Sequence, residues 1–159
     1  MNWRGSTNPT DRIFACLPYV LPLVYSLSFS GPLFAQLPEL QILFIPLMPI
    51  LALYQTIPFA SLIVFFALFM LVVRNENINH FIRFNTMQAI MIDIVLILCS
   101  VVVGFMLEPI LGSGLLLQTL FNVIFLGTIA AVAYAVVQSV LGRYAEIPTL
   151  SDAVYMQVR

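Results

Sequence analysis

The chain contains no lysine and only one histidine, and charged residues make up 8% of its 159 residues. An average soluble domain is about 25% charged. Hydrophobic residues account for 62% of the sequence, so a soluble fold would lack the polar side chains needed to cover its surface. The mean hydropathy of +1.05 agrees with this. The composition therefore predicts an integral membrane protein.

The scarcity of histidine, cysteine and deeply placed acid excludes several kinds of site. Cys16 and Cys99 both lie in apolar runs, which is typical of packing residues, and together with one histidine they do not suggest a metal site. His80 lies in a polar loop, so neither a zinc-protease motif nor a Ser–His pair is expected at membrane depth. An aspartyl protease needs two facing acids, whereas only Asp93 lies deep in an apolar run. The sequence therefore predicts no enzyme, no metal site and no cofactor. It also has no basic cluster, so no nucleic-acid partner is expected.

Arginine carries all the positive charge, and its placement predicts the topology. Short arginine-rich loops stay on the side from which a membrane protein is inserted. We predict a single membrane domain over residues 1–159 with four transmembrane helices, at about 13–29, 58–73, 85–107 and 115–141. The segments on one face then hold all six arginines, which are Arg4, Arg12, Arg74, Arg83, Arg143 and Arg159. Both termini should face the cytoplasm or its equivalent, with Arg74, Arg83 and Arg143 as inner-side anchors.

A proline-rich stretch, residues 30–57, separates the first two predicted spans. Its central part is apolar enough to cross a membrane, but it would then divide the arginines between the two faces. We therefore predict an interfacial or re-entrant segment, and whether residues 33–54 enter the bilayer stays open. Pro18 and Pro22 should kink the first span, which favours packing of that helix against protein.

The C-terminal tail, residues 142–159, is expected to lie at the inner membrane surface. Thr149 and Asp152 fit a capping box at the start of a helix. One face of that helix would be apolar, with Leu150, Ala153, Val154 and Val158. The predicted fold is thus an all-α membrane protein with four transmembrane helices, the proline-rich segment and a short amphipathic C-terminal helix.

Asp93 is the first candidate for a functional residue. It lies about 15 Å of helix beyond Arg83, near the middle of the bilayer, where an acid costs a few kcal/mol. Further polar side chains share its helix, namely Asn85, Thr86, Gln88 and Ser100. The five residues predict either a polar path or a hub of hydrogen bonds between helices.

Small side chains recur at every fourth position of the last span, at Gly127, Ala131, Ala135 and Ser139. Such spacing lets another helix approach closely in a membrane. The stripe predicts helix packing, either within one chain or between subunits.

Four blocks of the sequence occur in a fixed order: DRIFACLPYVLPL at 11–23, IPFASLIVFFALFMLVVRN at 57–75, HFIRFNTMQAIMIDI at 80–94 and EIPTLSDAVYMQVR at 146–159. Together they resemble the Tic-twenty family, the twenty-kilodalton membrane subunit of the translocon at the inner chloroplast envelope, with its cyanobacterial homologues. The short stretch before the first span resembles cyanobacterial or plastid-encoded members more than nuclear-encoded plant members.

The resemblance implies an integral membrane subunit of a protein translocon that contributes to a polypeptide-conducting channel or its core. It implies a plastid inner envelope or a cyanobacterial plasma membrane as the location. The implied partners are membrane lipids, other translocon subunits, precursor polypeptide as cargo and further copies of the chain. The residues themselves leave two alternatives open: a small-solute or ion transporter that uses Asp93, and a non-conducting membrane assembly factor.

Overall fold

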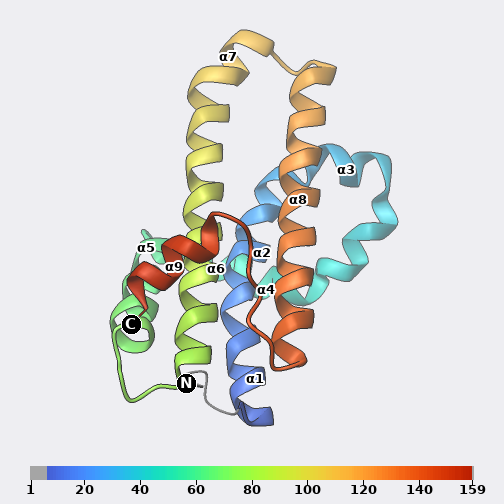
Figure 1. Ribbon diagram of the computed structural model, residues 1–159. Coiled ribbons are helices and arrows are strands. Elements are labelled where there is room, and N and C mark those ends of the chain that lie inside the picture. The colour runs from blue at the N-terminus through green and yellow to red at the C-terminus, as the bar shows by residue number, and fades with distance from the viewer. Residues whose placement is uncertain (1–6, 159) are drawn as a thin grey trace.

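The computed structural model describes residues 7–158, and every regular element in that range is helical (Figure 1). Four helical segments of this range are long and apolar enough to cross a membrane: Pro9–Phe29, Pro38–Thr56, His80–Leu111 and Leu115–Val140. A shorter apolar helix, Ala60–Val73, lies between the second and the third of these. The all-α membrane fold predicted from the composition is confirmed.

The predicted second span, at 58–73, differs from the one that helix length favours. The stretch Ala60–Val73 consists of α5 (Ala60–Leu68) and a π-helical turn, and it is about 21 Å long against a hydrocarbon layer of about 30 Å. The proline-rich stretch forms α3 (Gly31–Gln36), a 3₁₀ helix (Pro38–Leu47) and α4 (Met48–Thr56). Length and composition favour Pro38–Thr56 as a spanning helix, so a crossing at 58–73 stays a prediction.

The first span is the most enclosed of the four, with 44% of its apolar window buried against at most 28% in the others. It packs against both α6 (His80–Val102) and α8 (Leu115–Val140). Pro18 and Pro22 remove backbone donors, and short 3₁₀ turns interrupt the helix around them. The span is therefore divided into α1 (Pro9–Cys16), Leu17–Tyr19, α2 (Val20–Ser26) and Leu27–Phe29.

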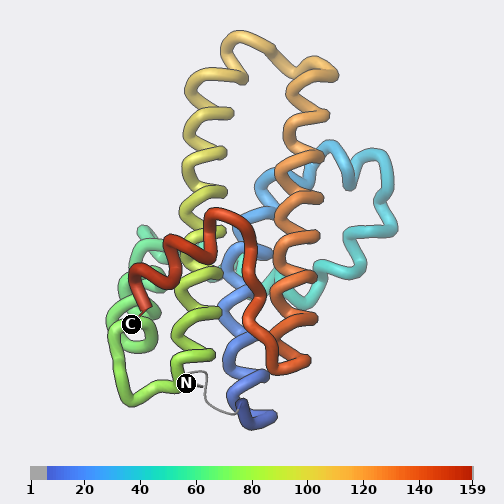
Figure 2. The backbone as a smooth tube through the Cα atoms, in the orientation of Figure 1, coloured from blue at the N-terminus to red at the C-terminus, as the bar shows by residue number. Residues whose placement is uncertain are grey.

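The third and fourth spans form an antiparallel pair joined at the top of Figure 1. Helix α6 continues through a π-helical turn (Val103–Leu107) into α7 (Glu108–Leu111). Gly112 follows with a φ of +59°, a conformation that side-chain-bearing residues rarely adopt, and the chain then turns into α8. The backbone trace in Figure 2 shows the same reversal.

Contacts between polar side chains gather three helix ends at the opposite end of the bundle. Asn79 caps α6, because its Oδ1 accepts from the Phe81 amide at 3.0 Å, and its Nδ2 donates to Asp11 of α1 at 2.9 Å. Arg12 donates from Nη1 to the Val140 carbonyl at the end of α8, at 3.2 Å. The segments that carry Arg12, Arg74, Arg83 and Arg143 therefore share one end, whereas Arg4 and Arg159 fall outside the described residues.

The C-terminal tail packs on the inner half of α6. Its helix α9 (Leu150–Gln157) is amphipathic as predicted, and Val154 is fully buried against a cluster that includes Phe84. Tyr144 of the tail lies with its ring centroid 5.0 Å from that of Phe84. Thr149 makes no side-chain capping hydrogen bond and has a φ of +67°, so the expected capping box does not form. Because its apolar face contacts α6, α9 is a packed part of the bundle, and its position at the inner membrane surface stays a prediction.

Candidate functional site

A buried polar network joins the first span, α6 and α8. Tyr19 donates from its hydroxyl to Asn85 Oδ1 at 2.9 Å. The Ser139 hydroxyl shares its proton between the same oxygen, at 2.9 Å, and the Ala135 carbonyl of its own helix, at 2.7 Å. Gln88 Nε2 donates to the Tyr19 hydroxyl at 3.1 Å. Asn85 Nδ2 donates in turn to the Phe81 carbonyl one turn earlier in α6, at 2.9 Å. Both nitrogen and oxygen of the Asn85 amide are therefore satisfied within the protein.

The network extends to the C-terminal helix, because Ser151 donates to Gln88 Oε1 at 3.5 Å. We call these residues the buried hub: Tyr19, Asn85, Gln88, Ser139 and Ser151. The first four expose at most 1% of their surface, so protein alone surrounds them. Side-chain hydrogen bonds that link helices stabilise bundles in lipid, where water cannot replace them. The hub thus fixes how four helical segments pack.

Two hub members were absent from the predicted site. Tyr19 stands in an apolar, proline-kinked span, and a phenol at that depth needs a partner, which is the signal that could have identified it. Ser151 lies in the tail, and its sequence context carries no such signal. Ser139 was predicted for its small size, but its hydroxyl also takes part in the network.

The remaining polar residues of α6 form separate contacts and do not make one continuous stripe. Thr86 is buried and donates to the Ile82 carbonyl of its own helix at 2.8 Å. Ser100 shares a hydrogen bond of 2.8 Å with the Tyr25 hydroxyl of α2. Both contacts satisfy polar groups locally, and neither reaches the hub.

Asp93 is the exception among these polar groups. Its Oδ1 is buried and has no hydrogen-bond partner among the described residues. Tyr54 of α4 lies close enough to interact electrostatically with the carboxylate. The structure therefore places an unsatisfied acid in the middle of α6, beside the proline-rich segment, one turn beyond the hub.

The predicted inner-side anchors lie in different surroundings. Arg83 is only 7% exposed, and its Nε donates to the Val73 carbonyl at 2.8 Å, which ties the end of Ala60–Val73 to α6. The guanidinium of Arg74 lies 5.9 Å from the Phe69 ring centroid, a cation–π distance. Arg143 is exposed beyond the end of α8.

The small-residue stripe of α8 divides between two faces. Ala135 and Ser139 are fully buried against the other helices. Ala131 is half-buried, while Gly127 is exposed, and a Cβ added there would meet nothing within 4 Å. Only the inner half of the stripe packs within the chain.

His80 is the first residue of α6 and contacts the C-terminal tail, so it differs from a solvated loop histidine. Its Nδ1 is 3.0 Å from the Tyr144 hydroxyl, and its Nε2 is 3.4 Å from the Val158 carbonyl. Among residues 7–158, no group of three or more His, Cys, Asp or Glu side chains could hold a metal ion.

These features define a multi-pass helical membrane protein whose bundle is tied together by buried polar contacts. The family model described as "Chloroplast import apparatus Tic20-like" matches residues 7–154. The chain therefore belongs to the Tic20 family, the family that its four sequence blocks resemble.

Individual relatives agree with this assignment. The chain is 55% identical to a "Tic20 family protein" of Synechocystis over 149 residues, which are 94% of this chain and 93% of that protein. It is 37% identical to "Protein TIC 20-II, chloroplastic" of Arabidopsis thaliana, with 96% of this chain and 74% of that protein covered. It is 34% identical to the "Tic20 family protein Ycf60" of Gracilaria tenuistipitata var. liui, with 93% and 75% covered.

Proposed function

We propose that this chain is an integral membrane subunit of a protein translocon and that the face around Asp93 takes part in the passage of polypeptide. The family description supports a role in an import apparatus. The observation that carries the finer proposal is the buried, unpartnered Oδ1 of Asp93. Ionisable groups inside a membrane are costly, and they characteristically mark polar pathways or partner contacts.

The surroundings of Asp93 support a contact with something outside the bundle. The segment Pro38–Thr56, which includes its neighbour Tyr54, has no buried residue at all. In a membrane protein such a surface faces lipid, another subunit or a passing chain. A polar backbone in transit that displaced the side chains covering Asp93 Oδ1 would supply the hydrogen-bond donor that this oxygen lacks.

The conduit itself is proposed to lie between subunits and not inside one chain. The core between the first span and α8 is filled by aromatic side chains such as Phe29, Phe34 and Phe125. The ring centroids of Phe34 and Phe125 are 5.7 Å apart, in an edge-to-face contact that leaves no room for a polypeptide between them. Further copies of the chain or other translocon membrane subunits would therefore complete the path for a precursor polypeptide.

The proposed location rests on the similarity to relatives, and the proposed orientation rests on the position of the arginines. The similarity to a cyanobacterial protein and to chloroplast proteins supports a cyanobacterial plasma membrane or a plastid inner envelope. The arginine-bearing end of the bundle is proposed to face the cytoplasm or stroma, with both termini on that side.

Replacing Asp93 tests the proposal. We expect Asp93→Leu to lower precursor translocation, or conductance in planar bilayers, by about tenfold or more, while complex assembly stays intact. Asp93→Asn should cause an intermediate loss, because the amide keeps polarity but not charge. The matched control is Asp152→Asn, which changes an exposed acid of α9 and should leave transport unchanged.

Other outcomes point away from a lined path. Silent variants at position 93 would contradict the proposal. Full activity of Asp93→Asn with loss in Asp93→Leu would indicate a neutral hydrogen-bonding clamp. Loss of ion or metabolite flux without loss of precursor transport would favour the transporter that uses Asp93.

A non-conducting assembly factor is the second candidate, and the exposed Gly127 on α8 favours it. A small residue facing outward at membrane depth lets a partner helix approach closely. This alternative is supported if the Asp93 variants are silent while Gly127→Leu alone releases the partner proteins.

A further inference from the structure

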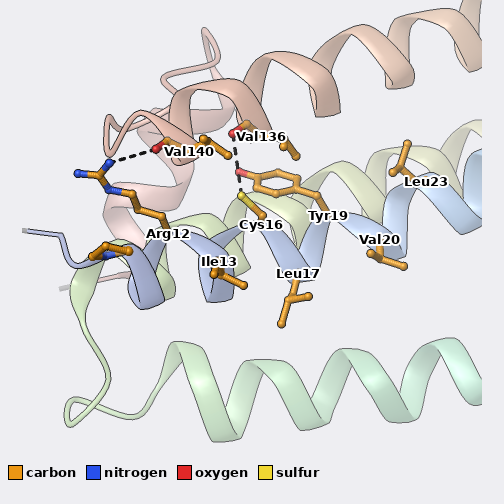
Figure 3. Close-up of a pocket in the computed structure, with 10 residues that line it drawn as sticks. Arg12, Ile13, Cys16, Leu17, Tyr19, Val20, Leu23, Val136 and Val140 are labelled. Atoms are coloured by element: carbon orange, nitrogen blue, oxygen red, sulfur yellow. Dashed lines mark hydrogen bonds between the residues drawn. The ribbon is translucent and has the colours of Figure 1, made fainter.

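An apolar groove runs along the surface between the first span and α8, with Arg12 near one end and Leu23 near the other (Figure 3). Its volume of about 580 Å³ is within the usual range of ligand pockets. The walls are mainly aliphatic and include Leu17, Val20 and Val136. From Arg12 to Leu23 the helix rises by about 16 Å, so the groove reaches from the inner end of the bundle well into the membrane.

Arg12 holds a positive charge at the inner end of this groove. Its Nη1 donates to the Val140 carbonyl, but its Nε is buried and has no hydrogen-bond partner among the described residues. No acidic side chain of residues 7–158 forms an ion pair with it. The guanidinium packs tightly against Gly142, since a Cβ at that position would lie 2.9 Å from the Arg12 Nε. The charge is thus fixed in place, and no side chain of residues 7–158 supplies a counter-ion.

We infer that the groove binds an anionic phospholipid, whose phosphate contacts Arg12 and whose acyl chain lies along Leu17, Val20 and Val136. A guanidinium forms short charge-assisted hydrogen bonds with phosphate oxygens. The aliphatic walls match a hydrocarbon chain. Arg12 lies at the arginine-rich end of the bundle, at the level of the lipid headgroups in the proposed topology.

Charge complementarity selects this occupant over two others. A zwitterionic phospholipid carries an ammonium group that Arg12 repels. The hydrophobic stretch of a secretory leader is preceded by basic residues, which would bring like charge to the same end. An anionic headgroup is the one that a single unpaired guanidinium stabilises.

Native mass spectrometry of the purified full-length chain in mild detergent tests the site. Phosphatidylglycerol should remain bound at one molecule per chain and should bind about tenfold more tightly than phosphatidylcholine. Arg12→Gln should abolish that preference, and Arg12→Lys should retain part of it. The matched control is Arg143→Gln, which removes an exposed guanidinium from the same end and should leave binding unchanged.

A second variant tests the part of the groove that would hold the acyl chain and leaves the charge of Arg12 unchanged. Val140 is 56% exposed at the edge of the groove, so Val140→Trp fills the slot at little cost to the core. Val140→Trp should lower the affinity for phosphatidylglycerol as strongly as Arg12→Gln does. Equal binding of the two lipids, an equal effect of Arg143→Gln, or unchanged binding to Val140→Trp would each overturn the inference. So would displacement of the lipid by glycerol phosphate or by a basic leader peptide at equal concentration.

Discussion

Asn85→Leu is expected to destabilise the protein by about 1–3 kcal/mol, because it leaves the buried Tyr19 hydroxyl without an acceptor for its proton. Tyr19 donates to Asn85 Oδ1, and the amide is fully buried. The Ser139 hydroxyl lies 2.9 Å from the same oxygen but also 2.7 Å from the Ala135 carbonyl, so it keeps an acceptor in the variant. After the substitution the Tyr19 hydroxyl keeps only its contact with Gln88, as an acceptor. The free energy of unfolding, measured by titration with sodium dodecyl sulfate in mixed micelles, should report this loss.

The same substitution on α8 is the matched control. Asn122 Oδ1 is buried but has no hydrogen-bond partner among the described residues. Asn122→Leu removes an unsatisfied group, so it should leave stability unchanged or raise it by about 1 kcal/mol. If both leucine variants change the free energy of unfolding equally, the hub does not stabilise the bundle in the way described here.

Phe84→Ala is expected to cost about 3–5 kcal/mol and to release the C-terminal tail from α6. The Phe84 ring is fully buried, and its centroid lies 5.0 Å from that of Tyr144 and 4.9 Å from that of Tyr155. Truncation leaves a cavity under the tail and removes both aromatic contacts. Hydrogen exchange should become faster in α9 than in α8, and a protease should cleave the chain between residues 144 and 158.

Phe105→Ala separates this effect from a general loss of hydrophobic surface. Phe105 follows α6 along the same continuous helix, but it is 81% exposed. Its truncation should change stability by no more than about 0.5 kcal/mol and should leave exchange in the tail unaltered. A tail that stays protected in Phe84→Ala would show that the aromatic contacts do not hold it.

Composition and charge placement were enough to predict the class of fold. The shortage of charge requires a membrane environment, and the arginines mark the end of the bundle at which α1 and α6 begin and α8 ends. Helix periodicity also predicted the amphipathic tail. Charge content, arginine placement and helix periodicity depend on residue types and their spacing alone, so they can be read from one sequence.

The second crossing could not be fixed in this way, because Pro38–Thr56 and Ala60–Val73 are both apolar and both imperfect as spans. Prolines interrupt the first, and the second is short. The sequence shows that α6 carries several polar side chains within the membrane. It does not show which side chains they contact, because those contacts depend on packing between distant segments. Asn85 meets Tyr19 across 66 positions of sequence, and no spacing rule predicts that pair.

The most direct test of the proposed function is site-specific photo-crosslinking in native membranes with a stalled precursor polypeptide. A photo-reactive amino acid replaces Tyr54, on the unburied segment Pro38–Thr56, or Leu126, which is 50% exposed on α8. We expect adducts with the precursor from position 54 and only lipid or subunit adducts from position 126. Absence of precursor adducts at position 54, with both variants assembled into their native complex, would contradict it.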